Sequence, residues 1–432
     1  MGAPSRDGSR FERLRPRSAG WWALVVVWAF VAGEAPADVA TGLEHTCALS
    51  APSTVECWGR NNRGQLGDGT LDDHALPAAV TGLAGLELVA VDAGEAFTCV
   101  QTLPGDLYCW GRNTEGQLGN GSTVSSSTPV AVVGLGGPVE SFSTGRQHAC
   151  AVLVGGTLKC WGDNVTGQLG DGTNSTRTSP VTISGIGGAV TVVASGFDHT
   201  CVVTASGSAL CWGDNFFGQL GDGGAAPESN VPGAVSGLSQ GVSGLAAGGF
   251  HTCARLAGGT MSCWGDNFYG QLGNATLTDH LVPEPVTGLG GAVASAHAGD
   301  SFTCARLVAG ELQCWGENLD GQLGDGTTTD RSSPGTVGGL GGAVSQVDLG
   351  HFHACAKLAT GAGFCWGDNT LGQLGDGSLS SASTPVQFLW PAAAVPLAFA
   401  TRLVLSVALV LGGVRAVRRR GRDTREPVLS RD

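Results

Sequence analysis

Residues 57–70 read CWGRNNRGQLGDGT, and close copies of this stretch return six more times along the chain. The later copies are CWGRNTEGQLGNGS at 109–122, CWGDNVTGQLGDGT at 160–173, CWGDNFFGQLGDGG at 211–224, CWGDNFYGQLGNAT at 263–276, CWGENLDGQLGDGT at 314–327 and CWGDNTLGQLGDGS at 365–378. The spacing between copies is always 51 or 52 residues. A fixed period of this length indicates units that bury their apolar faces against copies of themselves.

Each repeat contains four short stretches with strand character. In the second repeat these are Leu88–Asp92, Phe97–Gln101, Leu107–Gly111 and Thr128–Val133, separated by turn residues. A four-stranded antiparallel unit repeated seven times predicts a propeller, which leaves only short, protected strand edges. A solenoid would need specialised terminal repeats, and the first and last repeats here resemble the others. We therefore expect an all-β chain with a seven-bladed β-propeller over residues 38–389.

The composition agrees with this fold and limits the partners. Of 432 residues, 72 are Gly and 14% are charged, which is typical of short strands joined by tight turns. The formal net charge of −13 is unevenly distributed, because residues 38–395 contain 30 Asp and Glu against 10 Lys and Arg. An acidic body repels phosphate backbones and anionic lipids. We therefore expect no nucleic-acid binding by the body.

All 14 cysteines fall into seven pairs whose members are ten positions apart. A turn signal such as Pro104-Gly105-Asp106 lies within each pair, so the two cysteines face one another across a hairpin. Facing residues approach to about 4.5 Å between Cα atoms, which a disulfide accepts. A metal site would need closer spacing and further ligands. We expect one disulfide in each blade: Cys47 with Cys57, Cys99 with Cys109, Cys150 with Cys160, Cys201 with Cys211, Cys253 with Cys263, Cys304 with Cys314 and Cys355 with Cys365.

These units resemble the repeats of the regulator of chromosome condensation family. The shared features are a His-Thr start, an aromatic-Gly-x-Asn turn and a Gly-Gln-Leu-Gly loop, over about 350 residues. The resemblance implies a seven-bladed propeller. The founding eukaryotic member is a nuclear guanine-nucleotide exchange factor that also binds nucleosomes, so exchange activity is an alternative function that the resemblance implies. A fold alone does not fix a function.

The N-terminal residues 1–37 are typical of a signal peptide. Five arginines precede an apolar run, Trp21–Ala32, and the A-x-A form then occurs at Ala35-Pro36-Ala37. Retention of the segment as an uncleaved anchor is the alternative.

The C-terminal residues form a second candidate membrane segment. A short linker, 390–395, leads to an apolar stretch at 396–414, expected to be a transmembrane or sorting helix, and then to a basic cytoplasmic tail at 415–432. The stretch is similar to bacterial surface-sorting tails of the PEP-CTERM type, with a plain tail anchor as the alternative. Both interpretations predict an exported propeller at the cell surface or the outer face of the membrane, anchored there or released by processing. The disulfides also require an oxidising compartment.

Three recurrent residue sets could carry chemistry, and each is better explained by structure. A His or Phe stands two positions before the first cysteine of each pair, and because Phe substitutes for His, we expect packing and a local hydrogen bond rather than a metal site. Asp-Asn pairs such as Asp163-Asn164 lack the spacing of a calcium loop, and both residues form turns. The Trp of each CWG is expected in the core between blades. We expect no catalytic residues, no metal and no cofactor. The His and Phe positions are His45, Phe97, His148, His199, His251, Phe302 and His353, and the tryptophans are Trp58, Trp110, Trp161, Trp212, Trp264, Trp315 and Trp366.

One position in the repeats indicates where a partner would dock. The two residues before Gly-Gln-Leu-Gly are Phe216-Phe217 in the fourth repeat and Phe268-Tyr269 in the fifth, and they are polar or aliphatic elsewhere. Exposed aromatic clusters often dominate binding energy. The alternative is that the second ring of each pair packs under its own loop.

The function we expect is that of an exported, surface-anchored protein-binding scaffold without catalytic activity. Its partner would be an extracellular or surface protein, or a glycan, and it would contact the membrane through the C-terminal helix. The alternatives are the exchange activity named above and a hydrolase or lyase site assembled across blade loops.

Overall fold

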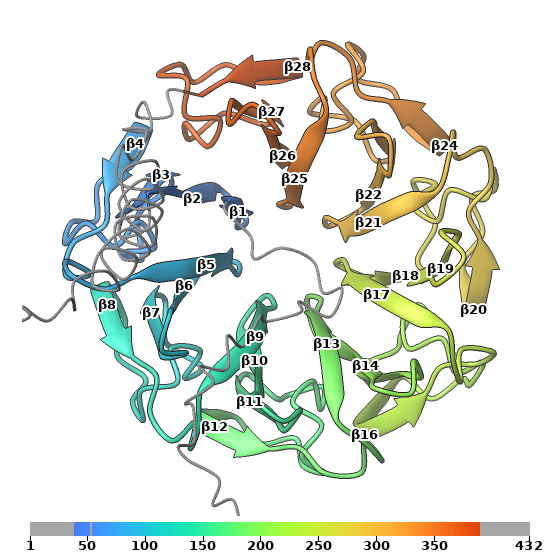
Figure 1. Ribbon diagram of the computed structural model, residues 1–432, viewed down its shortest axis with the longest axis horizontal. Coiled ribbons are helices and arrows are strands. Elements are labelled where there is room, and N and C mark those ends of the chain that lie inside the picture. Colours follow the sequence, from blue (N-terminus) through green and yellow to red (C-terminus); the bar gives the residue numbers. More distant parts are fainter. Residues whose placement is uncertain (1–38, 52–53, 389–432) are drawn as a thin grey trace, which may run out of the picture. The chain divides into compact units, whose positions relative to one another are not determined.

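The computed structural model describes residues 39–51 and 54–388, in which all regular elements are β-strands. Figure 1 shows these strands as seven sheets around a central axis. The expected signal peptide at 1–37, the linker at 390–395, the apolar stretch at 396–414 and the basic tail at 415–432 lie outside the described residues. Within the described ranges, no helix could span a membrane.

Each sheet is one blade made of four consecutive strands. Blades 1 to 3 contain β1 (Val39–Thr41), β2 (His45–Ala51), β3 (Thr54–Gly59), β4 (His74–Ala79); β5 (Leu88–Ala93), β6 (Phe97–Thr102), β7 (Leu107–Gly111), β8 (Ser126–Ala131); and β9 (Val139–Thr144), β10 (His148–Leu153), β11 (Leu158–Gly162), β12 (Arg177–Thr182). Blades 4 and 5 contain β13 (Val190–Ser195), β14 (His199–Thr204), β15 (Ala209–Asp214), β16 (Glu228–Ala234); and β17 (Val242–Ala247), β18 (His251–Leu256), β19 (Met261–Gly265), β20 (His280–Pro285). Blades 6 and 7 contain β21 (Val293–Ala298), β22 (Phe302–Leu307), β23 (Leu312–Gly316), β24 (Arg331–Thr336); and β25 (Val344–Leu349), β26 (His353–Leu358), β27 (Gly363–Gly367), β28 (Ala382–Gln387).

The strands expected in the second repeat agree with β5, β6 and β7, whereas the fourth begins two residues earlier than expected. The cause is an irregularity in the register of β7 and β8, where Cys109 pairs with Val130 but Gly111 already pairs with Ser126. Gly111 has a φ of 106°, and a Cβ there would lie 2.5 Å from the carbonyl oxygen of Ala96. Glycine is therefore required after Trp110.

All seven expected disulfides are present, one in each blade, and no described cysteine is free. In each blade the two cysteines face one another across the second and third strands, as Cys99 and Cys109 do in β6 and β7. Their Cα atoms are 4.0–4.1 Å apart, and their side chains are at most 1% exposed. A short closed loop of this kind stabilises the fold by roughly 2–3 kcal/mol in the chain-entropy model.

Neighbouring blades are joined through the tryptophans, as the sequence predicts. Each Trp is at most 1% exposed, and its indole Nε1 donates to the backbone carbonyl of the Gly-Gln-Leu-Gly glutamine in the preceding blade. In blade 2, for example, Trp110 Nε1 lies 2.8 Å from the Gln65 oxygen. The Trp and the Gln that recur in every repeat therefore hold neighbouring blades together. The seven pairs are Trp58 with Gln373, Trp110 with Gln65, Trp161 with Gln117, Trp212 with Gln168, Trp264 with Gln219, Trp315 with Gln271 and Trp366 with Gln322.

The ring closes without exchange of strands between the first and last blades. β1 is the innermost strand of blade 1 and pairs only with β2 in that sheet. Blade 7 instead contacts blade 1 through the same bonds that join other neighbours, with Trp58 donating to Gln373 at 2.9 Å. Asp348 adds a further link, since its Oδ2 accepts from the Thr41 amide at 2.7 Å. Closure is thus one more copy of the inter-blade contact.

Candidate functional site

Two sets of loops emerge at the same end of the propeller. The inner loops join the first and second strands of each blade, and the outer loops join the third and fourth strands. The sets are in contact, because the residue after Trp-Gly donates its amide to an inner-loop carbonyl, as Asp214 does to Asp198 at 2.7 Å. We call this end the upper face and the opposite end, with the hairpins between second and third strands, the lower face.

The outer loop holds its shape through its own polar side chains. In blade 5, Asp266 accepts from the Phe268 amide at 3.1 Å and from Gln271 Nε2 at 2.7 Å. Buried Asn267 accepts from the Leu272 amide and donates to loop carbonyls. The Asp-Asn pairs therefore form turns, as the sequence analysis predicts. Among the residues that the structure describes, no group of three or more His, Cys, Asp or Glu side chains could hold a metal ion.

This loop geometry turns the residue after the Asn toward solvent. In four successive blades that residue is apolar and 61–74% exposed. In blades 7, 1 and 2 it is Thr370, Asn62 and Thr114. The four exposed residues therefore form an arc over one side of the upper face, which we call the apolar arc. Its members are Val165, Phe216, Phe268 and Leu319.

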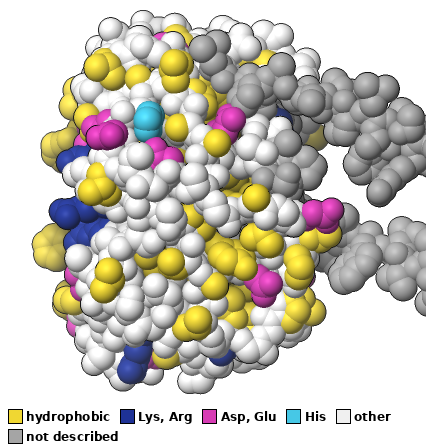
Figure 2. Space-filling view, turned by 90° about the vertical axis from the view of Figure 1, so that its left-hand side faces the viewer, with side chains coloured by type: hydrophobic (Ala, Val, Ile, Leu, Met, Phe, Trp, Pro, Cys, Tyr) yellow, Lys and Arg dark blue, Asp and Glu magenta, His cyan; other side chains and the backbone are white. Residues whose placement is uncertain are grey.

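Exposed apolar residues elsewhere are distributed differently. Later positions of the outer loops carry Leu71, Val124, Leu277 and Leu379 in blades 1, 2, 5 and 7, all aliphatic and without an aromatic ring among them. Figure 2 shows the side of the propeller that faces left in Figure 1, where hydrophobic side chains lie in small groups, with charged side chains scattered among them. Single exposed apolar residues are normal on protein surfaces, whereas a run over neighbouring blades marks a candidate interaction site.

The four aromatic residues singled out in the sequence divide into two kinds. Phe216 and Phe268 are 74% and 71% exposed, whereas Phe217 and Tyr269 are half-buried. Within each pair the ring centroids lie 5.0 and 4.9 Å apart. Phe217 also contacts Phe250 of blade 5, with centroids 5.3 Å apart, so it packs against a neighbouring inner loop as well as its own pair.

Three residues of the inner loops extend the aromatic surface to the axis. Phe197 stacks on His351 with centroids 4.3 Å apart, and it contacts Phe250 at 5.6 Å. Phe197 follows β13 and His351 follows β25, which lie on opposite sides of the axis in Figure 1. The stack therefore crosses the axis. A run of aromatic contacts leads from His351 through Phe197, Phe250 and Phe217 to exposed Phe216.

The sequence analysis did not identify these inner-loop residues. They are far apart in the chain, and aromatic residues occupy the inner loops in only some repeats. For Phe197 and His351, the signal that could have found them is the variable position directly after the inner-loop glycine, whereas Phe250 stands one position later. The variable position reads Leu43, Glu95, Arg146, Phe197, Gly249, Asp300 and His351.

Negative charge accompanies the apolar arc. At the position after Trp-Gly, blades 1 and 2 carry Arg60 and Arg112, whereas blades 3 to 7 carry carboxylates. Burial raises the pKa of Asp198 to about 6, and the nearby Arg146, 3.0 Å away, partly opposes that shift. Burial and Asp266 raise the pKa of Asp300 to about 6. Arg146 also opposes the shift at Asp300, so it is the cation that this group of carboxylates shares.

The histidines two positions before the cysteines are structural, but their hydrogen bond is not local as we expected. Each of the five is fully buried, and its Nε2 lies 2.8–2.9 Å from a Thr hydroxyl of the next blade. Burial lowers their pKa values to about 3 or 4, so they are neutral. The packing interpretation is therefore correct, with the bond joining neighbouring blades.

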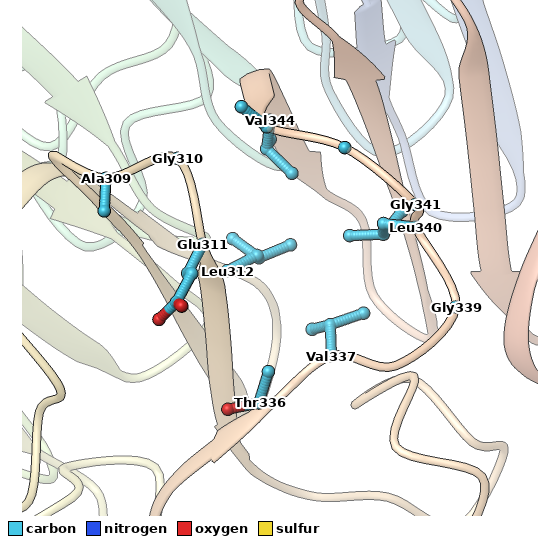
Figure 3. A pocket seen from close by; sticks show the side chains of 12 residues that line it. Ala309, Gly310, Glu311, Leu312, Thr336, Val337, Gly339, Leu340, Gly341 and Val344 are labelled. Carbon is cyan, nitrogen blue, oxygen red and sulfur yellow. The ribbon is translucent and has the colours of Figure 1, made fainter.

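The lower face carries a shallow hollow of about 260 Å³ between the hairpin of blade 6 and the connection to blade 7. Figure 3 shows Leu312, Val337 and Leu340 directing their side chains toward one another there. Glu311 is the only carboxylate in its lining. Apolar side chains and glycines make up most of this lining, and Glu311 and Thr336 are its polar side chains.

Comparison with known proteins gives consistent matches. Residues 73–408 match the family model described as the RCC1-like domain, and residues 37–65 match that of the regulator of chromosome condensation (RCC1) repeat. The chain is 33% identical over 352 residues to the ultraviolet-B receptor UVR8 of Arabidopsis thaliana, covering 80% of each protein.

Two further proteins show how widely the domain is used. The chain is 31% identical over 350 residues to the human E3 ubiquitin-protein ligase HERC2, covering 79% of this chain but 7% of the ligase. The structure of Prp20p from Saccharomyces cerevisiae has a TM-score of 0.70 at 19% identity, covering 81% of this chain and 86% of Prp20p. At that identity the likeness concerns the fold alone.

Proposed function

The chain belongs to the family of proteins with an RCC1-like domain, and we propose that it is an exported, surface-anchored protein-binding scaffold without catalytic activity. The partner is an extracellular or surface protein that docks on the upper face, and a glycan is the alternative. Protein binding has precedent in this fold, since Prp20p has binding properties to Gsp1p and histones.

The apolar arc carries the proposal. Phe216 and Phe268 occupy equivalent positions in adjacent blades and expose about three quarters of their surface, at 74% and 71%. Their loops are fixed by side-chain hydrogen bonds and by blades that are each closed by a disulfide. Aromatic side chains on a rigid support lose little conformational freedom on binding, so they favour tight docking.

The disulfides support export. Seven buried disulfides form and persist in an oxidising compartment, whereas cytosolic proteins are usually kept reduced. A signal peptide at 1–37 would deliver the propeller to such a compartment. An apolar segment at 396–414 followed by the basic tail would then hold it at the membrane, or direct its sorting to the surface.

Photo-crosslinking in cells that express the chain tests the proposal. Phe216 is replaced by p-benzoylphenylalanine, and a matched variant carries the same residue at Val308, which is 71% exposed on the lower face. We expect a covalent adduct with a protein from position 216 and none from position 308. Equal yields at both positions, or no adduct at 216, would contradict docking on the upper face.

A further inference from the structure

The loops of the lower face carry almost no charge. They are the six connections between successive blades and the hairpins between the second and third strands of blades 2 to 7, and together they contain three charged residues, Glu87, Asp106 and Glu311. On the upper face, the outer loop of blade 1 at residues 60–73 alone contains five. The lower face is therefore the less polar of the two. The connections are residues 80–87, 132–138, 183–189, 235–241, 286–292 and 337–343, and the hairpins are residues 103–106, 154–157, 205–208, 257–260, 308–311 and 359–362.

Each of these six hairpins begins with an exposed apolar residue. The backbone amide of that residue donates to the carbonyl of the residue just before the first strand of its blade, as Val154 does to Pro138 at 2.9 Å. The same bond, at 2.8–2.9 Å, recurs in all six blades, so it fixes the six residues at equivalent positions around the axis. We call them the apolar ring. Its members are Leu103, Val154, Ala205, Ala257, Val308 and Ala359.

The chain enters and leaves the described propeller on this face. Val39 is the end of β1 that lies farther from the upper-face loop, as the pairing of β1 with β2 shows. β28 ends at Gln387, which pairs with Phe364 beside the hairpin of blade 7. Residues 388–395 lead from there to the apolar stretch at 396–414, and a segment of that length spans at most about 28 Å. A membrane anchor in that stretch would therefore hold the lower face close to the bilayer.

We propose that the lower face rests on the surface of a phospholipid bilayer, with the apolar ring at the boundary between headgroups and acyl chains. The inference rests on the proposed function, because the anchor brings this face to the membrane. Apolar side chains favour that boundary, and a face with few carboxylates is repelled less by lipid phosphates than the acidic upper face would be. The upper face, with the apolar arc, then points away from the membrane toward the partner.

A bilayer suits this surface better than a protein does. The apolar ring has no aromatic anchor, and its loops offer few charged groups that could fix a partner in one orientation. The hollow beside blade 6 adds further apolar surface, since Leu312, Val337 and Leu340 face one another there and Ala309, next to Val308 of the ring, lines it (Figure 3). A fluid lipid surface needs no fixed orientation about the propeller axis.

Photo-crosslinking to lipid tests this placement. The full oxidised chain is reconstituted into phosphatidylcholine vesicles with p-benzoylphenylalanine at Val154 or at Val308, and lipid adducts are measured by mass after irradiation. Val165 is the matched control, because it lies on the upper face of the same blade as Val154 and is similarly exposed, at 66% against 63%. We expect lipid adducts from both lower-face positions, at a yield at least roughly tenfold above that from Val165, because interfacial apolar groups reach the acyl chains. Melting temperatures show whether each variant keeps the fold.

The outcomes separate this inference from the proposed function. A chain that does not float with the vesicles contradicts the membrane anchor, and this inference falls with it. A chain that floats but lacks a lipid adduct at one or both lower-face positions, or gives an equal yield at Val165, overturns the placement of the lower face while the anchor stands. Adducts between two copies of the chain at Val154 and Val308 would overturn lipid as the occupant. Docking of a protein on the apolar arc is measured at Phe216 and is affected by none of these results.

Discussion

Nε2 of His353 in the last blade lies 2.8 Å from Oγ1 of Thr46 in the first, which joins the two ends of the propeller. Thr46 donates its only hydroxyl proton to the Gln373 carbonyl, 2.8 Å away. His353 must therefore carry its proton on Nε2 and donate it to Thr46. The same arrangement links His45 with Thr98, His148 with Thr200, His199 with Thr252 and His251 with Thr303.

The two blades with Phe in place of His follow a matching rule. Phe97 shares a core cluster with Ala149 of the next blade, and Phe302 shares one with Ala354. Each His thus faces a Thr and each Phe faces an Ala. The replacement of His by Phe in two blades is therefore matched by a replacement of Thr by Ala in the blade that follows each of them.

This pairing predicts a rescue. Thr46→Ala leaves the Nε2 proton of buried His353 without an acceptor, and we expect it to destabilise the fold by about 1–3 kcal/mol. Adding His353→Phe recreates the Phe-Ala pair and should recover most of the loss. A double-mutant cycle in chemical denaturation measures the coupling between the two sites. Additive losses in the double variant would contradict the pairing rule.

Glu317→Gln should stabilise the oxidised chain more at pH 8 than at pH 5. Burial raises the folded-state pKa of Glu317 to about 7, above its unfolded value, so the folded state binds the proton more tightly. The unaltered chain therefore loses stability as pH rises from about 4.5 to 7, and the glutamine variant avoids that loss. Thermal melts at both pH values measure it. A melting-temperature difference that is the same at pH 5 and pH 8 would rule out a raised pKa.

Ala275→Gly should stabilise the fold by about 1 kcal/mol. Ala275 is the one described non-glycine residue with positive φ, at 65°, and blade 6 has Gly326 at the equivalent position. A left-handed conformation costs an L-residue roughly 1–2 kcal/mol, partly offset by the greater freedom of glycine in the unfolded chain. Gly326→Ala is the reciprocal control and should lower the melting temperature. A lower melting temperature for Ala275→Gly together with a higher one for Gly326→Ala would show that backbone strain does not govern this turn.

The exported protein should contain no free thiol. Intact-mass measurement with and without reductant should differ by 14 hydrogens, because all 14 cysteines are paired. Alkylation of the native protein provides a second readout, since the sulfurs are buried. Any thiol labelled before unfolding would contradict complete pairing.

The sequence predicted the features that repeat and missed those that do not. Period, cysteine spacing and turn residues are local, so the blades, disulfides and Trp contacts could be derived from them. The contact of Phe197 with His351 crosses the axis between residues more than 150 positions apart, and no local pattern indicates it. The sequence analysis singled out the position that Val165 and Leu319 occupy, but only for its aromatic residues. It grouped aliphatic with polar residues there, so it did not predict that Val165 and Leu319 are exposed.

The affinity of the protein partner for a Phe216→Ser and Phe268→Ser double variant tests the central claim most directly. The partner identified by cross-linking is titrated against the unaltered chain, the double variant and Val308→Ser. We predict that the double variant binds at least roughly thirtyfold more weakly, as expected from the loss of about 2 kcal/mol or more at an aromatic anchor, while Val308→Ser binds normally and all three melt at the same temperature. Unchanged affinity in the double variant, or weaker binding that accompanies a lower melting temperature, would contradict docking on the apolar arc.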